Sequence, residues 1–171
     1  MPSSTDTLDL APLKLLPGEG RRLERDVSLA DLTFGEDTYL AEPSLIPVAI
    51  DLSRMTGGGW ALRLRFSAAL KGPCMRCLEA ASPSTSVDTR EVDAPGGGEE
   101  LTSPYVDEDV IDLRAWVRDA FALALPAQVI CRPDCAGLCA DCGVNLNEHP
   151  EHEHERGPDP RWNALREITF D

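Results

Sequence analysis

Cysteine supplies the clearest chemistry in this sequence. Two of the six cysteines form a short pair, Cys74-Met-Arg-Cys77, and the other four lie close together at Cys131, Cys135, Cys139 and Cys142. The run Cys139-x-x-Cys142-Gly143 has the spacing of a zinc knuckle, in which a tight turn directs two thiolates at one ion. The glycine that follows can take the positive φ that turns backbone N–H groups toward sulfur. Two such pairs, far apart in the chain, predict a structural zinc site that folding closes.

The predicted ligands are the cysteines of the two Cys-x-x-Cys pairs: Cys74, Cys77, Cys139 and Cys142. Joining the pairs closes a loop of roughly 60 residues, which costs about 3–4 kcal/mol of chain entropy. Structural zinc contributes about 10–16 kcal/mol in small peptides, so the loop is no objection. An alternative zinc site combines Cys131 and Cys135 with Cys139 and Cys142, and it leaves the first pair without a role. The plain alternative is that the cysteines are free buried thiols. Single buried thiols are common in proteins, but six of them at these spacings are improbable.

Iron–sulfur chemistry is a further alternative. Cys135-x-x-x-Cys139-x-x-Cys142 has the spacing with which radical S-adenosylmethionine enzymes hold a cluster. Those enzymes resemble partial or full α/β barrels, whereas this chain of 171 residues has no repeated strand–helix units. The sequence also contains no nucleophile elbow and no phosphate-binding loop, so we expect a protein that is not an enzyme.

Three histidines follow the cysteines, at His149, His152 and His154. They could supply metal ligands, and His152-Glu153 matches part of a zinc-protease helix. The residue four positions after His152 is Arg156 and not histidine, so that motif fails. We interpret the segment as a solvated acidic loop.

Composition and charge describe an acidic globular chain, long enough for one domain with a real core. The net charge of −14 disfavours indiscriminate nucleic-acid binding, because it repels phosphate. We expect a cytoplasmic protein, since no run is long and apolar enough to span a membrane and the first residues lack the features of a signal peptide. A reducing cytosol favours metal binding over disulfides.

Strands with alternating apolar residues must position the first cysteine pair. Residues 48–55 and 60–70 predict a hairpin across a triple glycine, and residues 84–92 predict a third strand. Within 60–70, alternation puts one set of side chains, Trp60, Leu62, Leu64 and Phe66, on the face opposite Arg63 and Arg65.

The clearest helix leads into the cysteine cluster. An apolar stripe runs along one side of it: Leu113, Trp116, Val117, Ala120, Phe121 and Ala124. Asp112 can cap its start, and Pro126 ends it. A last short helix is predicted from Asp159-Pro160, and its docking residues would be Trp162, Leu165 and Ile168.

The predicted fold class is therefore α+β. An antiparallel β-rich body, made of the hairpin and further strands, carries one packed amphipathic helix, a zinc-knuckle-like cysteine cluster and a short C-terminal helix. We divide this single domain into an N-terminal arm at 1–18, a body at 19–130 with its helix at 112–125, and a cysteine-rich and C-terminal segment at 131–171.

A basic stripe is the candidate binding surface. Arg63 and Arg65 share a strand face, and Lys71 and Arg76 follow toward the first cysteine pair. Such a stripe could hold an RNA backbone or an acidic protein surface. The plainer alternative is a solvated strand face whose charges offset the acidic loops.

Four stretches together resemble the YceD-like family, also called large ribosomal RNA subunit accumulation proteins. They are Cys74-Met-Arg-Cys77-Leu78-Glu79, the helix start Ile111-Asp112-Leu113 with its end Ala124-Leu125-Pro126, the run from Cys131 to Asn147, and Asp159-Pro160-Arg161-Trp162-Asn-Ala-Leu165. The resemblance covers roughly residues 45–168.

The resemblance implies a cytoplasmic, non-enzymatic factor that supports accumulation of 23S ribosomal RNA and assembly of the large subunit. Its partner would be precursor ribosomal RNA or a large-subunit ribosomal protein, with no membrane and no small-molecule substrate. The resemblance does not supply a binding surface, and we add the hypothesis that the partner docks through the surface of Arg63, Arg65 and Arg76. Two other hypotheses stay open at this point. One is an acidic adaptor that binds and shields a basic ribosomal protein, and the other is an iron–sulfur enzyme.

Overall fold

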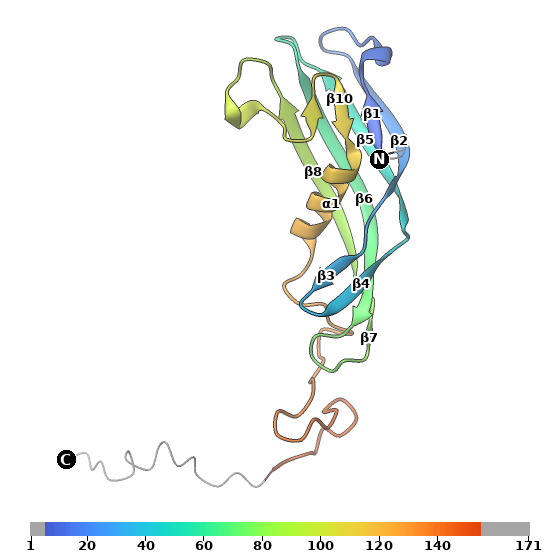
Figure 1. Ribbon diagram of the computed structural model, residues 1–171, viewed down its shortest axis with the longest axis vertical. Helices are drawn as coiled ribbons and strands as arrows, with labels where there is room; N and C mark the ends of the chain where they lie inside the picture. Colours follow the sequence, from blue (N-terminus) through green and yellow to red (C-terminus); the bar gives the residue numbers. More distant parts are fainter. Residues whose placement is uncertain (1–5, 155–171) are drawn as a thin grey trace, which may run out of the picture.

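A long central strand organises the structure, which is a computed structural model that describes residues 6–154 (Figure 1). This strand, β6 (Trp60–Pro73), pairs antiparallel with β5 (Leu45–Arg54) and then β4 (Asp37–Glu42) along one side. Along its other side it pairs with β8 (Ser84–Asp93) and then β7 (Ala80–Ala81). Strand β2 (Gly20–Ser28) extends the sheet beyond β5, and β3 (Leu32–Phe34) extends it beyond β4.

A second, three-stranded sheet has the order β1-β10-β9. Its strands are β1 (Thr7–Asp9), β9 (Val106–Asp107) and β10 (Val110–Asp112). Two 3-10 turns, η1 (Ala11–Leu13) and η2 (Glu99–Leu101), and one helix, α1 (Leu113–Ala124), complete the described elements. Among the described residues, no helix is long and apolar enough to cross a bilayer.

The core lies between the large sheet and α1. Alternation along β5 and β6 buries one face of each strand: Ile46, Val48, Ile50 and Leu52, and Trp60, Leu62, Leu64, Phe66, Ala68 and Leu70. The structure confirms the predicted hairpin and the predicted third strand, and it lengthens all three strands. The pattern is mostly antiparallel β with one helix, as an α+β class requires.

Helix α1 covers the buried face of the sheet through the predicted stripe. Its buried side chains are Leu113, Trp116, Val117, Ala120 and Phe121, while Ala124 is exposed. Phe121 meets Phe66 of β6 with ring centroids 6.3 Å apart. The side chain of Asp112 accepts a hydrogen bond from the backbone N–H of Ala115 at 2.9 Å, which confirms the predicted N-cap.

Several short strands had no sequence signal strong enough to predict them. In β4 only Tyr39 and Ala41 are buried, and Tyr39 donates its hydroxyl hydrogen to the carbonyl of Pro73 at 2.9 Å. The predicted helix that starts at Asp159-Pro160 lies outside the described residues. The division into arm, body and cysteine-rich segment stays a prediction.

The helix–sheet contact gives a direct test of this core. Replacing Phe121 by Ala removes a fully buried ring and should lower the free energy of unfolding by about 3–5 kcal/mol. The matched control is Leu123→Ala two residues on, since Leu123 is 87% exposed and the change should stay within about 0.5 kcal/mol. Urea denaturation of the two metal-equilibrated variants measures both free energies of unfolding. Equal losses of stability in the two variants would contradict the observed helix orientation.

Candidate metal centre

The two Cys-x-x-Cys pairs fold into the same turn. In the first knuckle, residues 74–79, the carbonyl of Cys74 accepts from the N–H of Leu78 at 2.9 Å, and the N–H of Cys74 donates to Glu79 at 2.7 Å. In the second knuckle, residues 139–144, the carbonyl of Cys139 accepts from Gly143 at 2.8 Å, and its N–H donates to Val144 at 2.8 Å. The two turns therefore share one backbone pattern.

A positive φ follows each pair, as the zinc-knuckle spacing predicted for the second. Gly143 has φ +76°, and Leu78, at the equivalent position of the first knuckle, has φ +62°. A left-handed conformation is unfavourable for a residue with a Cβ, so Leu78 holds a conformation that suits glycine better. The first knuckle thus carries local strain that its surroundings must offset.

Cysteines 74 and 77 meet Cys131 and Cys135 in space. All four sulfurs lie within 4.8 Å of one another. The Cys74–Cys135 and Cys77–Cys131 sulfur distances are 3.8 and 3.6 Å, far longer than a disulfide bond of about 2.05 Å. With zinc–sulfur bonds of about 2.3 Å, a tetrahedral site has sulfurs about 3.8 Å apart. The first cysteine group therefore has the donors and the spacing to hold a metal ion.

The chain brings this group together at the junction between the sheet and the segment after α1. The first knuckle follows β6 directly, and the N–H of Met75 donates to the carbonyl of Val129 at 2.8 Å. Arg76 reaches across as well, because its Nη1 donates to the carbonyl of Cys135 at 3.2 Å and its Nε to Gln128 at 3.1 Å. Strand β6 and the end of the helix are thus joined beside the thiols.

Hydrogen bonds and burial shift the ionisation of these thiols in opposite directions. Burial raises the pKa of Cys74, but backbone N–H groups of Cys77, Arg76 and Cys131 outweigh it and lower this pKa to about 6. Burial, followed by contacts with the other thiols of the group, raises the pKa of Cys131 to about 12. Without a cation the group cannot ionise fully, whereas a bound metal ion would stabilise all four thiolates.

Asn147 supports the first group from the outside. Its side-chain nitrogen contacts the sulfur of Cys135 at 3.5 Å, and its side-chain oxygen accepts from the N–H of Ala136 at 2.8 Å and from Arg132 at 2.9 Å. Hydrogen bonds of this kind orient metal ligands and tune their basicity.

The other two cysteines form a second group with histidine. The ligand atoms of Cys139, Cys142, His152 and His154 lie within 4.8 Å of one another. The structure therefore does not bring the predicted set of Cys74, Cys77, Cys139 and Cys142 together in one group, nor the alternative set of the last four cysteines. Each would combine residues from two different groups. The iron–sulfur spacing fails for the same reason, because Cys135 belongs to the first group and the other two cysteines to the second.

Sequence reasoning missed the two histidines. His152 and His154 contact the thiol of Cys142 although His152 is only half-buried and His154 is exposed, while His149 lies outside the group. The missed signal is the order Cys-x-x-Cys followed within ten residues by His-x-His, which combines zinc-type donors in one short segment.

The basic residues of the predicted stripe do not form one free surface. Arg63 and Arg65 share the outer face of β6, and their partners are carboxylates of adjacent strands. Arg63 Nε donates to Asp88 at 2.7 Å, and Arg65 Nη2 donates to Asp51 at 2.7 Å. The hydrogen bonds from Arg63 lower the pKa of Asp88, and those from Arg22 lower that of Asp51. Lys71 lies further along the strand, and Arg76 is bound at the first cysteine group.

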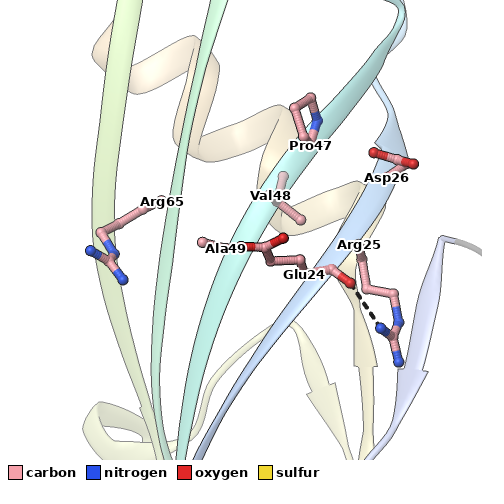
Figure 2. A pocket seen from close by; sticks show the side chains of 7 residues that line it. All are labelled: Glu24, Arg25, Asp26, Pro47, Val48, Ala49 and Arg65. Atoms are coloured by element: carbon pink, nitrogen blue, oxygen red, sulfur yellow. Dashed lines mark hydrogen bonds between the residues drawn. The ribbon is translucent and has the colours of Figure 1, made fainter.

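A shallow hollow of about 540 Å³ opens on this outer face beside Arg65 (Figure 2). In the strand register, Ala49 of β5 lies between Glu24 of β2 and Arg65 of β6. The short alanine side chain leaves space between the two longer ones. The other lining residues are Arg25, Asp26, Pro47 and Val48. Both signs of charge therefore border the hollow, which is well away from the cysteines.

Comparison with known proteins identifies a family for this chain. The model of the family described as "Large ribosomal RNA subunit accumulation protein YceD" matches residues 62–169, well over half of the chain. The chain belongs to the YceD family. The matched span includes most of β6, all of α1 and both cysteine groups, while β2 and β5 precede it.

Three relatives show how far the likeness to individual proteins extends. A protein of uncharacterised function from Mycobacterium tuberculosis is 40% identical over 103 residues, which cover 57% of this chain and 49% of the relative. A Mycobacterium leprae protein, also uncharacterised, is 36% identical over 101 residues, covering 56% and 46%. The Zea mays "Large ribosomal RNA subunit accumulation protein YCED homolog 1, chloroplastic" is 26% identical over 167 residues, covering 75% and 55%.

This YceD family member spans about half the length of the curated relatives that it matches. No solved structure matches it.

The strained turn at Leu78 yields a prediction for this knuckle. Leu78→Gly should raise the free energy of unfolding by about 1 kcal/mol relative to Leu78→Ala, because only glycine relieves the left-handed φ. Comparison with alanine cancels the loss of the leucine side chain, which is 65% exposed. Chemical denaturation of the two metal-equilibrated variants measures the difference. A glycine variant no more stable than the alanine variant would contradict the observed turn.

Proposed function

We propose that this protein is a non-enzymatic factor for biogenesis of the large ribosomal subunit, and that it supports accumulation of 23S ribosomal RNA. The observation that carries this proposal is the family match, whose description names large ribosomal RNA subunit accumulation. The maize relative carries the same description at lower identity. Within this proposal the metal site has a structural role and the sheet supplies the binding surface.

The metal of the first cysteine group is proposed to be Zn²⁺. Four thiolates in tetrahedral spacing are the donor set of closed structural zinc sites, which leave no position open for a substrate. Zinc would hold the end of β6 and the segment after α1 together, and it would thereby fix the helix end against the sheet. The ligands in this proposal are Cys74, Cys77, Cys131 and Cys135, which replace the set expected from sequence.

The partner is proposed to dock on the outer face of β2, β5, β6 and β8. Across this face one strand register aligns Arg22, Asp51, Arg63 and Arg90, and the next aligns Glu24, Ala49, Arg65 and Asp88. Arg63 and Arg65 could exchange their carboxylate partners for phosphates of precursor RNA. Lys71 extends the same face toward the knuckle. Arg76 contributes less directly in this proposal, since it already binds Gln128 and Cys135.

A second candidate is an adaptor for a basic large-subunit ribosomal protein. It is favoured by the pairing of Arg63 and Arg65 with Asp88 and Asp51, which offsets their positive charge, and by the net charge of −14. A protein with this field attracts basic partners and repels phosphate at long range.

The cellular role can be tested by loss and replacement of the gene. Cells that lack the protein should accumulate less 23S RNA relative to 16S RNA, and the wild-type chain should restore the ratio. Cys77→Ala should fail to restore it, because removal of one ligand opens the first group, whereas Met75→Ala in the same turn keeps all four ligands. Ribosomal RNA is quantified directly. An unchanged ratio in cells without the protein would contradict the proposed function, while rescue by Cys77→Ala would contradict only the role of the metal.

The two partner classes predict opposite effects of charge on the outer face. If RNA binds there, Arg63→Gln with Arg65→Gln should weaken binding and reduce the slope of log affinity against log salt by about 2. The matched variant, Asp51→Asn with Asp88→Asn, has the opposite charge change and should strengthen binding. If the partner is a basic ribosomal protein, the arginine variant should bind more tightly and the aspartate variant more weakly. Affinities of each variant for precursor large-subunit RNA and for purified large-subunit proteins decide between them, and no effect of either variant would exclude this face.

A further inference from the structure

We propose that Cys139, Cys142, His152 and His154 bind a second Zn²⁺, so that the chain carries two metal sites rather than the single site that its sequence suggests. The second group is built from one short segment, and it shares no ligand with the first group. Its donors are two thiolates and two imidazoles, a combination found in closed structural zinc sites.

The nitrogens and sulfur of this group converge on one point. The Nε2 atoms of His152 and His154 lie 2.9 Å apart, and they lie 3.1 and 3.2 Å from the sulfur of Cys142. The imidazole rings are nearly perpendicular, at 88°. Each ring N–H lies in its ring plane and can serve one acceptor, so three mutual contacts cannot all be good hydrogen bonds. A cation in the centre would accept a lone pair from every one of these atoms.

The distances fit zinc after a small expansion. Zinc–nitrogen bonds of about 2.0–2.1 Å and zinc–sulfur bonds of about 2.3 Å place nitrogens about 3.3 Å apart and nitrogen about 3.6 Å from sulfur. The observed separations are a few tenths of an ångström shorter. His152 and His154 are two residues apart in a segment without helix, and their Nε2 atoms nevertheless meet at 2.9 Å.

The turn that presents the two cysteines is the same as in the first group. The carbonyl of Cys139 accepts from Gly143, and its N–H donates to Val144, as Cys74 does with Leu78 and Glu79. The first knuckle faces two more cysteines, whereas the second faces two histidines. The same backbone turn thus occurs twice, each time facing a different pair of potential ligands. This repetition is a reason to regard the second group as a site that does not depend on the histidine distances.

The segment between the groups joins them physically. Leu138 donates its N–H to Arg76 of the first knuckle at 3.1 Å, and Leu146 donates to Gly137 at 2.9 Å. A Cβ on Gly137 would stand 3.2 Å from the carbonyl oxygen of Arg76, so the two segments are in close contact. The second ion would therefore order a loop that packs on the first knuckle and also supplies Asn147.

Metal content of the purified full-length protein tests the proposal. After equilibration with Zn²⁺ and removal of the excess, the wild-type chain should retain two ions. The double variant His152→Ala with His154→Ala should retain one, and the control His149→Ala should retain two, because His149 is outside the group. One ion in the wild type, or two in the double variant, would overturn the proposal.

A second measurement needs no variant and so does not depend on variant folding. Two filled sites share six sulfurs and two nitrogens, so X-ray absorption of the zinc-loaded wild type should show an average of three sulfur and one nitrogen neighbours per ion. Four sulfurs and no nitrogen would overturn the second site and leave the first. Both measurements are made on purified protein, so their outcome is separate from that of the ribosomal RNA experiment.

Discussion

The packing of four thiols at the end of β6 is the constraint on which the other features depend. Their sulfurs approach to 3.6–3.8 Å, and the pKa of Cys74 falls to about 6 while that of Cys131 rises to about 12. Hydrogen bonds lower the pKa of Cys74 and also that of Cys135, whereas the pKa values of Cys77 and Cys131 are raised, so the four thiols do not ionise equally. Such a group is stable as a fully ionised set only around a cation. The fold therefore places a group that could hold a metal ion where the sheet meets the segment after α1.

The same arrangement separates the proposed binding surface from the proposed metal site. Helix α1 covers the inner face of the sheet (Figure 1), and the hollow lies on the opposite face, over β2, β5 and β6. The carboxylates of Asp88 and Asp51 accept hydrogen bonds from Arg63 and Arg65 on that face. Exposed pairs of this kind contribute little to stability, so exchanging a carboxylate for a partner's phosphate, or an arginine for a partner's cation, is energetically accessible. The face is suited to binding because its charges are ordered but not buried.

The elements with local patterns could be predicted from sequence, whereas the assembly of ligands could not. Alternation in β5, β6 and β8 and the stripe of α1 depend on neighbouring residues, so they are visible without tertiary structure. The positive φ of Gly143 followed from knuckle spacing in the same way. The first Cys-x-x-Cys pair meets whichever cysteines the chain brings back to it after α1. The spacing of Cys131, Cys135, Cys139 and Cys142 does not encode the direction of that return. The histidines were misjudged because nearby glutamates gave the segment a solvated composition.

The cysteine-rich segment has almost no hydrophobic core of its own. Between residues 131 and 154 the buried side chains are the thiols of Cys135 and Cys139, and every other side chain is exposed or half-buried. Segments this short cannot offset their conformational entropy by apolar burial. The ordered turns need another source of free energy, and metal binding at the two groups of converging donors, as proposed above, would supply it. A conventional core thus holds the sheet and α1, while metal–ligand bonds would hold the segment that follows them if the proposed sites are filled.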